Sequence, residues 1–239
     1  MFLLFSNISS KKYKSLLLFI LLLISFISIT KASAKNSVNN KENIAPWTQW
    51  KKVSSSALYY RQVTDSDLIE VKAQVNLSSS LSGFLLFLLD TDKIPNWLDN
   101  GKESKILQTI DNNTHIFTTE FYGFWPIKSR EMIIKSRQWQ NDDLSIEIQI
   151  ENAPDFDKKK HTILVDVISA HWRITPISRK EIDVIYTFIV DPKGNVPMWL
   201  VNPMTLKSTW KTLQNIKEQL PQSKWQLCTL ANIKEINVH

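Results

Sequence analysis

The sequence predicts an α+β domain in which a curved antiparallel β-sheet wraps around one long C-terminal helix. Three observations predict this fold class. Residues 68–77 alternate apolar and polar side chains, which is typical of a strand with one covered face. Further strand-like segments follow with short turns between them, which favours antiparallel neighbours. Residues 203–220 carry apolar side chains every three or four positions, so this helix has a face that needs a cover.

Residues 1–34 have the three parts of a secretory signal peptide. A basic stretch at 11–14 precedes an apolar run of 14 residues at 16–29, and the small residues 32–34 follow. The run is short for a membrane span, which needs about 20 apolar residues. The composition resembles that of a bacterial protein, so we expect cleavage after Ala34 and a periplasmic location. An N-terminal anchor that is not cleaved is the alternative.

Removal of residues 1–34 lowers the net charge from +6 to +2, because this segment holds four lysines and no acid. The remaining 205 residues show no concentrated basic face, so we expect no nucleic-acid partner. A chain of this length suffices for one domain with a substantial core, and we expect a monomer. After the signal peptide we expect a disordered leader at 35–43, the ligand-binding domain at 44–220 and a C-terminal tail at 221–239. Cys228 is the only cysteine, so the chain cannot form an internal disulfide.

The elements of the domain can be predicted in order. Trp47 and Trp50, three positions apart, predict a short N-terminal helix. Serines at 78–80 are candidate caps for a helix that begins at Leu81, and a second short helix is expected at 92–100. Asn202-Pro203 predicts the start of the last helix. Strands are expected at 59–63, 68–77, 104–111, 114–122, 130–139, 144–150, 161–174 and 180–190.

Five short motifs occur in the order in which a known family has them. They are Tyr59-Tyr60-Arg61, Asp90 followed seven positions later by Trp97, and the stretches 124–131 (FWPIKSRE), 171–176 (HWRITP) and 196–202 (VPMWLVN). Together they resemble the START (StAR-related lipid-transfer) family, and the resemblance spans 44–220. The chain departs from the family pattern at three places. Glu131 replaces the usual aspartate, Phe124 replaces the first proline, and Ala170-His171 replaces the usual glycine region.

The resemblance implies the helix-grip (START-like, Bet v 1-like) fold, with a tunnel between the sheet and the last helix for one lipid or sterol-like molecule. Together with the signal peptide and the composition, the resemblance predicts an exported bacterial carrier that needs no cofactor, catalyses no reaction and contacts membranes transiently. Related helix-grip proteins include cyclases, so an enzyme acting on a lipid or polyketide-like substrate stays open. An interaction module without a ligand is the other alternative.

Arg130 is the most informative polar residue. It shares one face of the strand 130–139 with Met132, which turns the guanidinium inward. A buried charge is costly unless it is paired. Asp166, on the same expected face of its strand as Trp172, is a candidate partner, and such a pair could orient a ligand headgroup. A structural salt bridge, or an arginine that reaches solvent, is the alternative.

Aromatic walls suit lipids and sterols, although ordinary core packing explains each tryptophan equally well. Trp199 precedes the last helix and marks the expected gate. The histidines lack metal-ligand spacing, one cysteine excludes a C-x-x-C pair, and no G-x-S-x-G or phosphate-loop motif occurs. We therefore predict no catalytic residue and no metal site. The predicted ligand-binding residues are Trp125, Arg130, Met132, Asp166, Trp172, Trp199 and Trp210.

Overall fold

The computed structural model describes residues 44–123, 127–153 and 155–236. The expected signal peptide and leader, and the ligand-binding candidate Trp125, lie outside the described residues. In the described ranges, no helix has the length and apolar character that crossing a membrane requires. The elements are β1 (Thr48–Val53), β2 (Ser56–Gln62), β3 (Ile69–Leu77), α2 (Leu81–Leu89), η1 (Thr91–Lys93), α3 (Ile94–Trp97), β4 (Gly101–Asp111), β5 (Thr114–Phe121), β6 (Arg130–Gln140), β7 (Ile146–Asn152), β8 (Ile163–Leu164), β9 (Asp166–Ser178), β10 (Glu181–Asp191), α4 (Met198–Gln219), η2 (Leu220–Gln222) and η3 (Lys224–Leu227).

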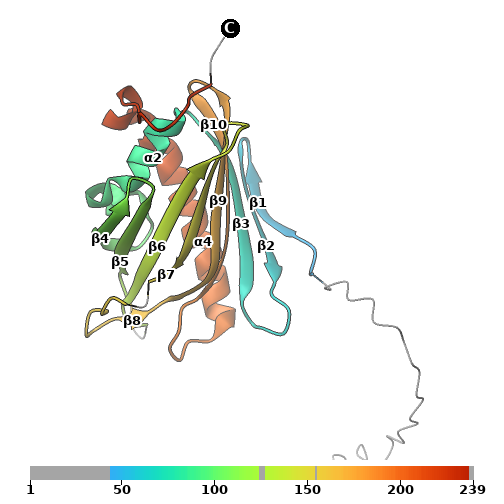
Figure 1. Ribbon diagram of the computed structural model, residues 1–239. Helices are drawn as coiled ribbons and strands as arrows, with labels where there is room; N and C mark the ends of the chain where they lie inside the picture. Colours follow the sequence, from blue (N-terminus) through green and yellow to red (C-terminus); the bar gives the residue numbers. More distant parts are fainter. Residues whose placement is uncertain (1–43, 124–126, 154, 237–239) are drawn as a thin grey trace, which may run out of the picture. The chain divides into compact units, whose positions relative to one another are not determined.

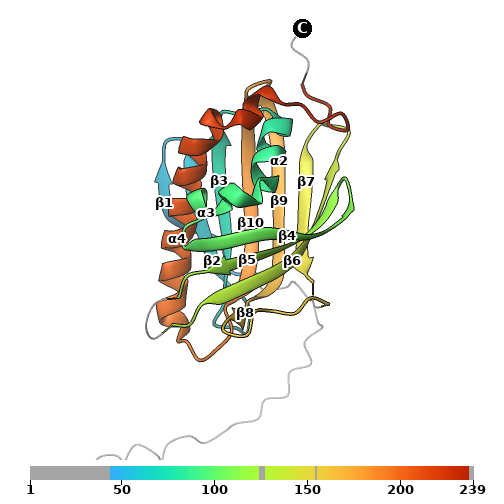
Figure 2. The same ribbon diagram turned by 90° about the vertical axis from the view of Figure 1, so that its left-hand side faces the viewer.

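The strands form one sheet in the order β1-β2-β3-β10-β9-β7-β6-β5-β4 with antiparallel neighbours, and the short β8 pairs in parallel with β6. The sheet curls around α4, with β4, β5 and β6 on one side of the helix and β1, β2 and β3 on the other (Figure 1). In Figure 2, α3 lies next to β4, and α2 lies above them in front of β9. The predicted architecture, a curved antiparallel sheet around a long C-terminal helix, is confirmed.

The strongest local predictions are confirmed. Strand β3 has alternating buried and half-buried side chains along its whole length, as the period-two pattern indicates. The Ser80 hydroxyl accepts a hydrogen bond from the Gly83 amide at 3.0 Å, so Ser80 is the N-cap of α2. On α4, the side chains that close over the sheet are Leu206, Leu213 and Ile216.

The N-terminal helix predicted from Trp47 and Trp50 is wrong, because this segment leads into the edge strand β1. Residues three apart in a strand point to opposite faces. Trp50 accordingly packs on Trp210, with ring centroids 6.3 Å apart. Trp47 lies on the outer face, 4.3 Å from the ammonium of Lys72 and 4.4 Å from the guanidinium of Arg61. The two tryptophans therefore pack on opposite faces of the sheet and not on one face of a helix.

The last helix begins one turn earlier than predicted, at Met198, with Pro197 at the N-cap and Pro203 inside the helix. Asn202 does not cap it; its side-chain amide donates to the carbonyl of Asp67 at 3.1 Å, in the β2–β3 loop. Because Pro203 has no N–H, the carbonyl of Trp199 lacks its helical partner. The first turn is thus helical but weakly bonded.

The C-terminal tail folds back over α2 (Figure 2). The Trp225 indole donates to the Asp90 carboxylate at 2.9 Å. The Glu235 carboxylate accepts from the amides of Leu81 at 3.1 Å and Ser82 at 2.8 Å, at the N-terminus of α2. A carboxylate stabilises a helix at this end, because free amides and the helix dipole both favour negative charge there.

Candidate ligand-binding site

A pocket of about 440 Å³ lies between α4 and the concave face of the sheet. Its walls come mainly from β5, β6, β10, α3 and α4, and most of the lining side chains are apolar. Arg130 and Gln138 both line it from opposite ends of β6, about 26 Å apart at the usual rise per residue of a strand. We call the end at Arg130 and the start of α4 the mouth end. The end at Gln138 and Asn113, beside α2, is the tail end.

A row of aromatic rings forms part of the floor. Trp172 on β9 and Tyr186 on β10 are cross-strand partners, and their rings stack at 4.1 Å with 18° between the planes. Phe188 continues the row at 4.9 Å from Tyr186, and Phe84 of α2 lies 6.0 Å from Trp172. Stacked rings hold each other in place and offer a large apolar surface to a ligand.

Arg130 makes its hydrogen bonds to neutral acceptors. The guanidinium donates to the carbonyls of Lys128, Pro192 at 3.4 Å and Lys193 at 3.2 Å, which belong to two loops at the mouth end. Burial lowers the pKa of Arg130, and it forms no ion pair with any described residue. Carbonyl oxygens satisfy the N–H groups but leave the positive charge without a counter-charge.

The predicted Arg130–Asp166 pair is wrong. The Asp166 carboxylate accepts from the Asn152 amide at 2.7 Å and pairs with the Lys193 ammonium at 3.1 Å. The reason is a register shift where β9 passes β10, which leaves Ile168 exposed while Val167 is buried. Such a bulge reverses the alternation, so Asp166 no longer shares a face with Trp172.

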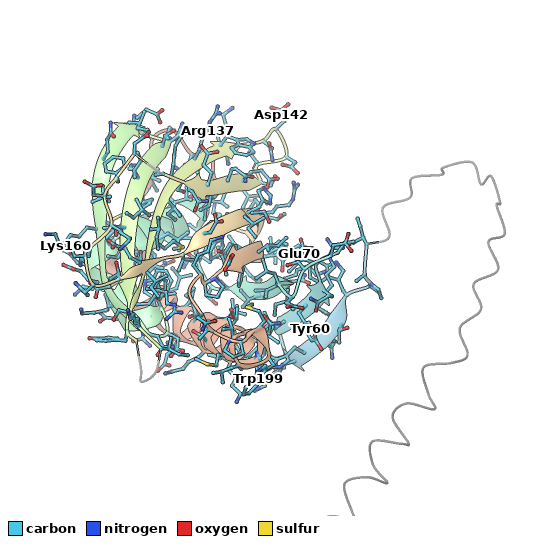
Figure 3. All side chains as sticks on the ribbon, turned by 90° about the horizontal axis from the view of Figure 1, so that it is seen from below. Tyr60, Glu70, Arg137, Asp142, Lys160 and Trp199 are labelled. Carbon is cyan, nitrogen blue, oxygen red and sulfur yellow. The ribbon has the colours of Figure 1, made fainter. Side chains whose placement is uncertain are left out.

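Among the predicted ligand contacts, Arg130, Met132 and Trp172 line the pocket together. Trp199 does not: its residue is 77% exposed, and Figure 3 shows it at the outer edge of α4. Trp210 packs outside the pocket, between Trp50 and the Lys51 ammonium, which lies 4.7 Å from its ring. The two tryptophans therefore flank the pocket from the outside.

The sequence analysis missed several polar side chains that line the pocket. Tyr186 lies on the predicted strand 180–190. It is two positions from the apolar residues Val184 and Phe188, so the alternation of a strand could have placed it on the inner face. On α4, hydroxyl side chains follow the apolar stripe at helical spacing, one position beside it. The hydroxyl and amide groups that line the pocket from α4 and β6 include those of Thr205, Ser208, Thr209, Ser136 and Gln138.

Within the described ranges, no group of three or more histidine, cysteine, aspartate or glutamate side chains is arranged to hold a metal ion. The geometry is that of a helix-grip domain with an internal apolar pocket. A sequence model of the START domain matches residues 31–226, and this chain belongs to the START family, whose general activity is the binding of lipids and other hydrophobic ligands.

Several known proteins are similar to the chain. It is 22% identical over 159 residues to an uncharacterised protein of Pseudomonas aeruginosa, covering 66% of this chain and 73% of that protein. A STAR-related lipid transfer protein from Xanthomonas axonopodis is 23% identical, with a TM-score of 0.66 over 74% of this chain and 99% of the other. Human STARD10 is 19% identical, with a TM-score of 0.60 over 76% and 80%. At these identities the two structures show the fold alone.

Proposed function

We propose that this protein is a monomeric periplasmic carrier that binds one anionic, single-chain lipid in the pocket. The observation that carries the proposal is an apolar pocket with a guanidinium at its mouth end that has no counter-charge among the described residues. The Xanthomonas relative is named a lipid transfer protein, which supports a carrier more than an enzyme. The pocket itself favours a ligand-binding domain over an interaction module with a filled core.

The volume of the pocket limits the ligand. Small-molecule sites occupy roughly 300–1,000 Å³, and about 440 Å³ lies in the lower part of that range. This favours a single hydrocarbon chain or a compact ring system over a lipid with two long chains. At about 25 cal/mol per Å² of buried apolar surface, a chain that hides a few hundred Å² gains several kcal/mol.

Arg130 would bind the acidic headgroup. Three of its N–H groups donate to loop carbonyls, which fixes the orientation of the guanidinium. Its remaining donors can bind a carboxylate or phosphate, and such charge-assisted bonds are stronger than those between neutral groups. The hydrocarbon chain would then run toward the aromatic row at Trp172.

The entrance would be the mouth end, where Val201 and Met204 of α4 line the pocket beside Arg130. The first turn of α4 can loosen there because Pro203 breaks its hydrogen-bond ladder. The exposed Trp199 on this turn suits a transient contact with a membrane surface, since tryptophan prefers the membrane–water interface.

The headgroup contact can be tested with palmitate and hexadecanol, which share a chain and differ in charge. The wild-type protein should bind palmitate at least about tenfold more tightly, since a charge-assisted bond contributes about 1.5–3 kcal/mol. Arg130→Met should remove this preference, while Arg137→Met, on the exposed face of the same strand, should keep it. An unchanged preference in Arg130→Met would show that the charge is structural.

The export step has its own test. Intact-mass measurement of the soluble protein from its native host should give an N-terminus at Lys35. A retained Met1 would contradict the signal peptide. Mass spectrometry of an organic extract from the same sample should identify an acidic single-chain lipid.

A further inference from the structure

Tyr186 lies on β10 and faces the pocket. On β10, Val184 and Phe188, two residues away on either side, are buried on the same face of the sheet. Tyr186 lines the pocket, so the surface that it still exposes belongs to the pocket wall. The side chain is therefore placed where the apolar body of a ligand would pass.

Two neighbouring rings contact the ring of Tyr186. Trp172 stacks on it at 4.1 Å, and the ring of Phe188 lies 4.9 Å away. The ring cannot swing its hydroxyl toward a distant partner without losing these contacts. The direction of the hydroxyl is thus set by the fold before any ligand binds.

The hydroxyl of Tyr186 has no hydrogen-bond partner among the described residues. Some other hydroxyls that line the pocket do: Ser104 and Thr119 bond each other at 3.0 Å, and Thr209 donates to the Thr205 carbonyl at 2.8 Å. Burial raises the pKa of Tyr186, so the group stays protonated over the whole ordinary pH range and can donate. A donor that faces an apolar pocket without a protein partner is poorly satisfied, and a bound molecule that accepts its hydrogen bond improves this.

We infer that the Tyr186 hydroxyl is a polar anchor for an oxygen atom carried by the hydrocarbon body of the ligand. The inference rests on the proposed lipid binding and narrows its ligand class. The ligand would be an acidic single-chain lipid with a hydroxyl or keto group part of the way along its chain. Its acidic head would bind Arg130, and its mid-chain oxygen would accept from Tyr186. A site of this kind disfavours an analogue that lacks the oxygen or carries it elsewhere.

The test uses octadecanoate and a series of octadecanoates with one hydroxyl or keto group at different positions. Calorimetric titration of the wild-type protein should find one position that binds about three- to tenfold more tightly than the others. In Tyr186→Phe, which keeps the ring, this positional preference should disappear and plain octadecanoate should bind at least as well as before. Tyr59→Phe, the same change on the outer face of the sheet, should keep the preference.

The outcomes separate the two proposals. If octadecanoate and all its derivatives fail to bind the wild-type protein, the proposed function is overturned and this inference with it. If they bind without a positional preference, or if Tyr186→Phe keeps the preference, only the anchor is overturned. The melting temperature of Tyr186→Phe should not fall, because the hydroxyl has no protein partner to lose. A clear fall would assign the hydroxyl a structural role instead.

Discussion

The two ends of the pocket are built differently. At the tail end, the C-terminal segment joins α2 to the turns between strands through several hydrogen bonds. The Asn232 amide donates to Asn113 at 3.0 Å, and the backbone of Lys234 exchanges two bonds, of 2.9 and 2.8 Å, with the Gln140 side chain. At the mouth end, the start of α4 lacks a helical bond and is tied to the sheet loops through Asn202. The difference supports the proposed entry of the ligand at the mouth end.

This comparison explains why the tail would matter for the proposed carrier. The tail caps α2, whose Leu85, Leu88 and Leu89 line the pocket at this end. A hydrocarbon chain that enters from the mouth end would therefore meet these leucines of α2 at the tail end. If both ends opened equally, the position of the headgroup would not be fixed by Arg130.

Deletion of residues 229–239 should have the largest effect. It removes the Glu235 cap and the packing of Leu230 and Ile233 on the core, so we expect a loss of about 2–4 kcal/mol in the free energy of unfolding. Urea unfolding measures this loss, and ligand dissociation should accelerate. Leu227→Ala, at a residue that is 94% exposed just before the deleted segment, should change neither quantity. Unchanged stability after the deletion would contradict the role of the tail.

Glu235→Gln should have a smaller effect at the same end. The amide keeps the length of the side chain but loses the charge that faces the first amides of α2, so we expect a loss of about 1 kcal/mol. The matched control is Glu218→Gln, an exposed position on α4 that forms no ion pair with a described residue. Urea unfolding at low and high salt should show that the difference shrinks with salt. A loss as large as that of the deletion would assign the whole effect to this one side chain.

Two opposite changes at the mouth end should alter rates more than stability. Pro203→Ala gives the Trp199 carbonyl a helical partner, so the exchange of cis-parinaric acid should slow several-fold. Asn202→Ala removes the bond to Asp67, so exchange should accelerate. Stopped-flow fluorescence measures both rates. Equal rates in the two variants would place the entrance elsewhere in the molecule.

Much of the fold could be predicted because it follows from periodicity. The alternation in 68–77 and the apolar stripe of the last helix each follow from a regular element with one covered face. The predictions failed where a local feature breaks the period. The bulge near Ile168 turned Asp166 away from the pocket, and the i,i+3 spacing of Trp47 and Trp50 concealed a strand.

The site could be predicted in part for a related reason. The alternation of side chains along a strand predicted that Met132 and Arg130 lie on the pocket face. It could not show that the partners of Arg130 are carbonyls at Pro192 and Lys193, because the path of a distant loop decides which oxygen atoms arrive. Trp199 illustrates the same limit, since the exposure of its side chain depends on the residue at which α4 begins.

The smallest effect that we predict concerns acid, at the outer surface of the sheet. Glu120 accepts hydrogen bonds from Lys102 at 2.6 Å and Lys159 at 2.7 Å. Burial raises its pKa, but hydrogen bonds from these lysines and from His161 outweigh it and lower the pKa to about 2. A carboxylate whose pKa is lowered on folding adds stability above its ordinary pKa near 4.5, and this stability is lost as the pH falls toward 2.

We therefore expect the free energy of unfolding to fall between pH 4.5 and pH 2, by less than about 1 kcal/mol for this cluster because its lysines are partly exposed. Glu120→Gln should flatten that part of the profile. Urea unfolding across the pH range measures the profile. If Glu120→Gln and Glu151→Gln, an exposed acid paired with Lys135, gave the same profile as the wild-type protein, the cluster would contribute nothing that depends on its charge.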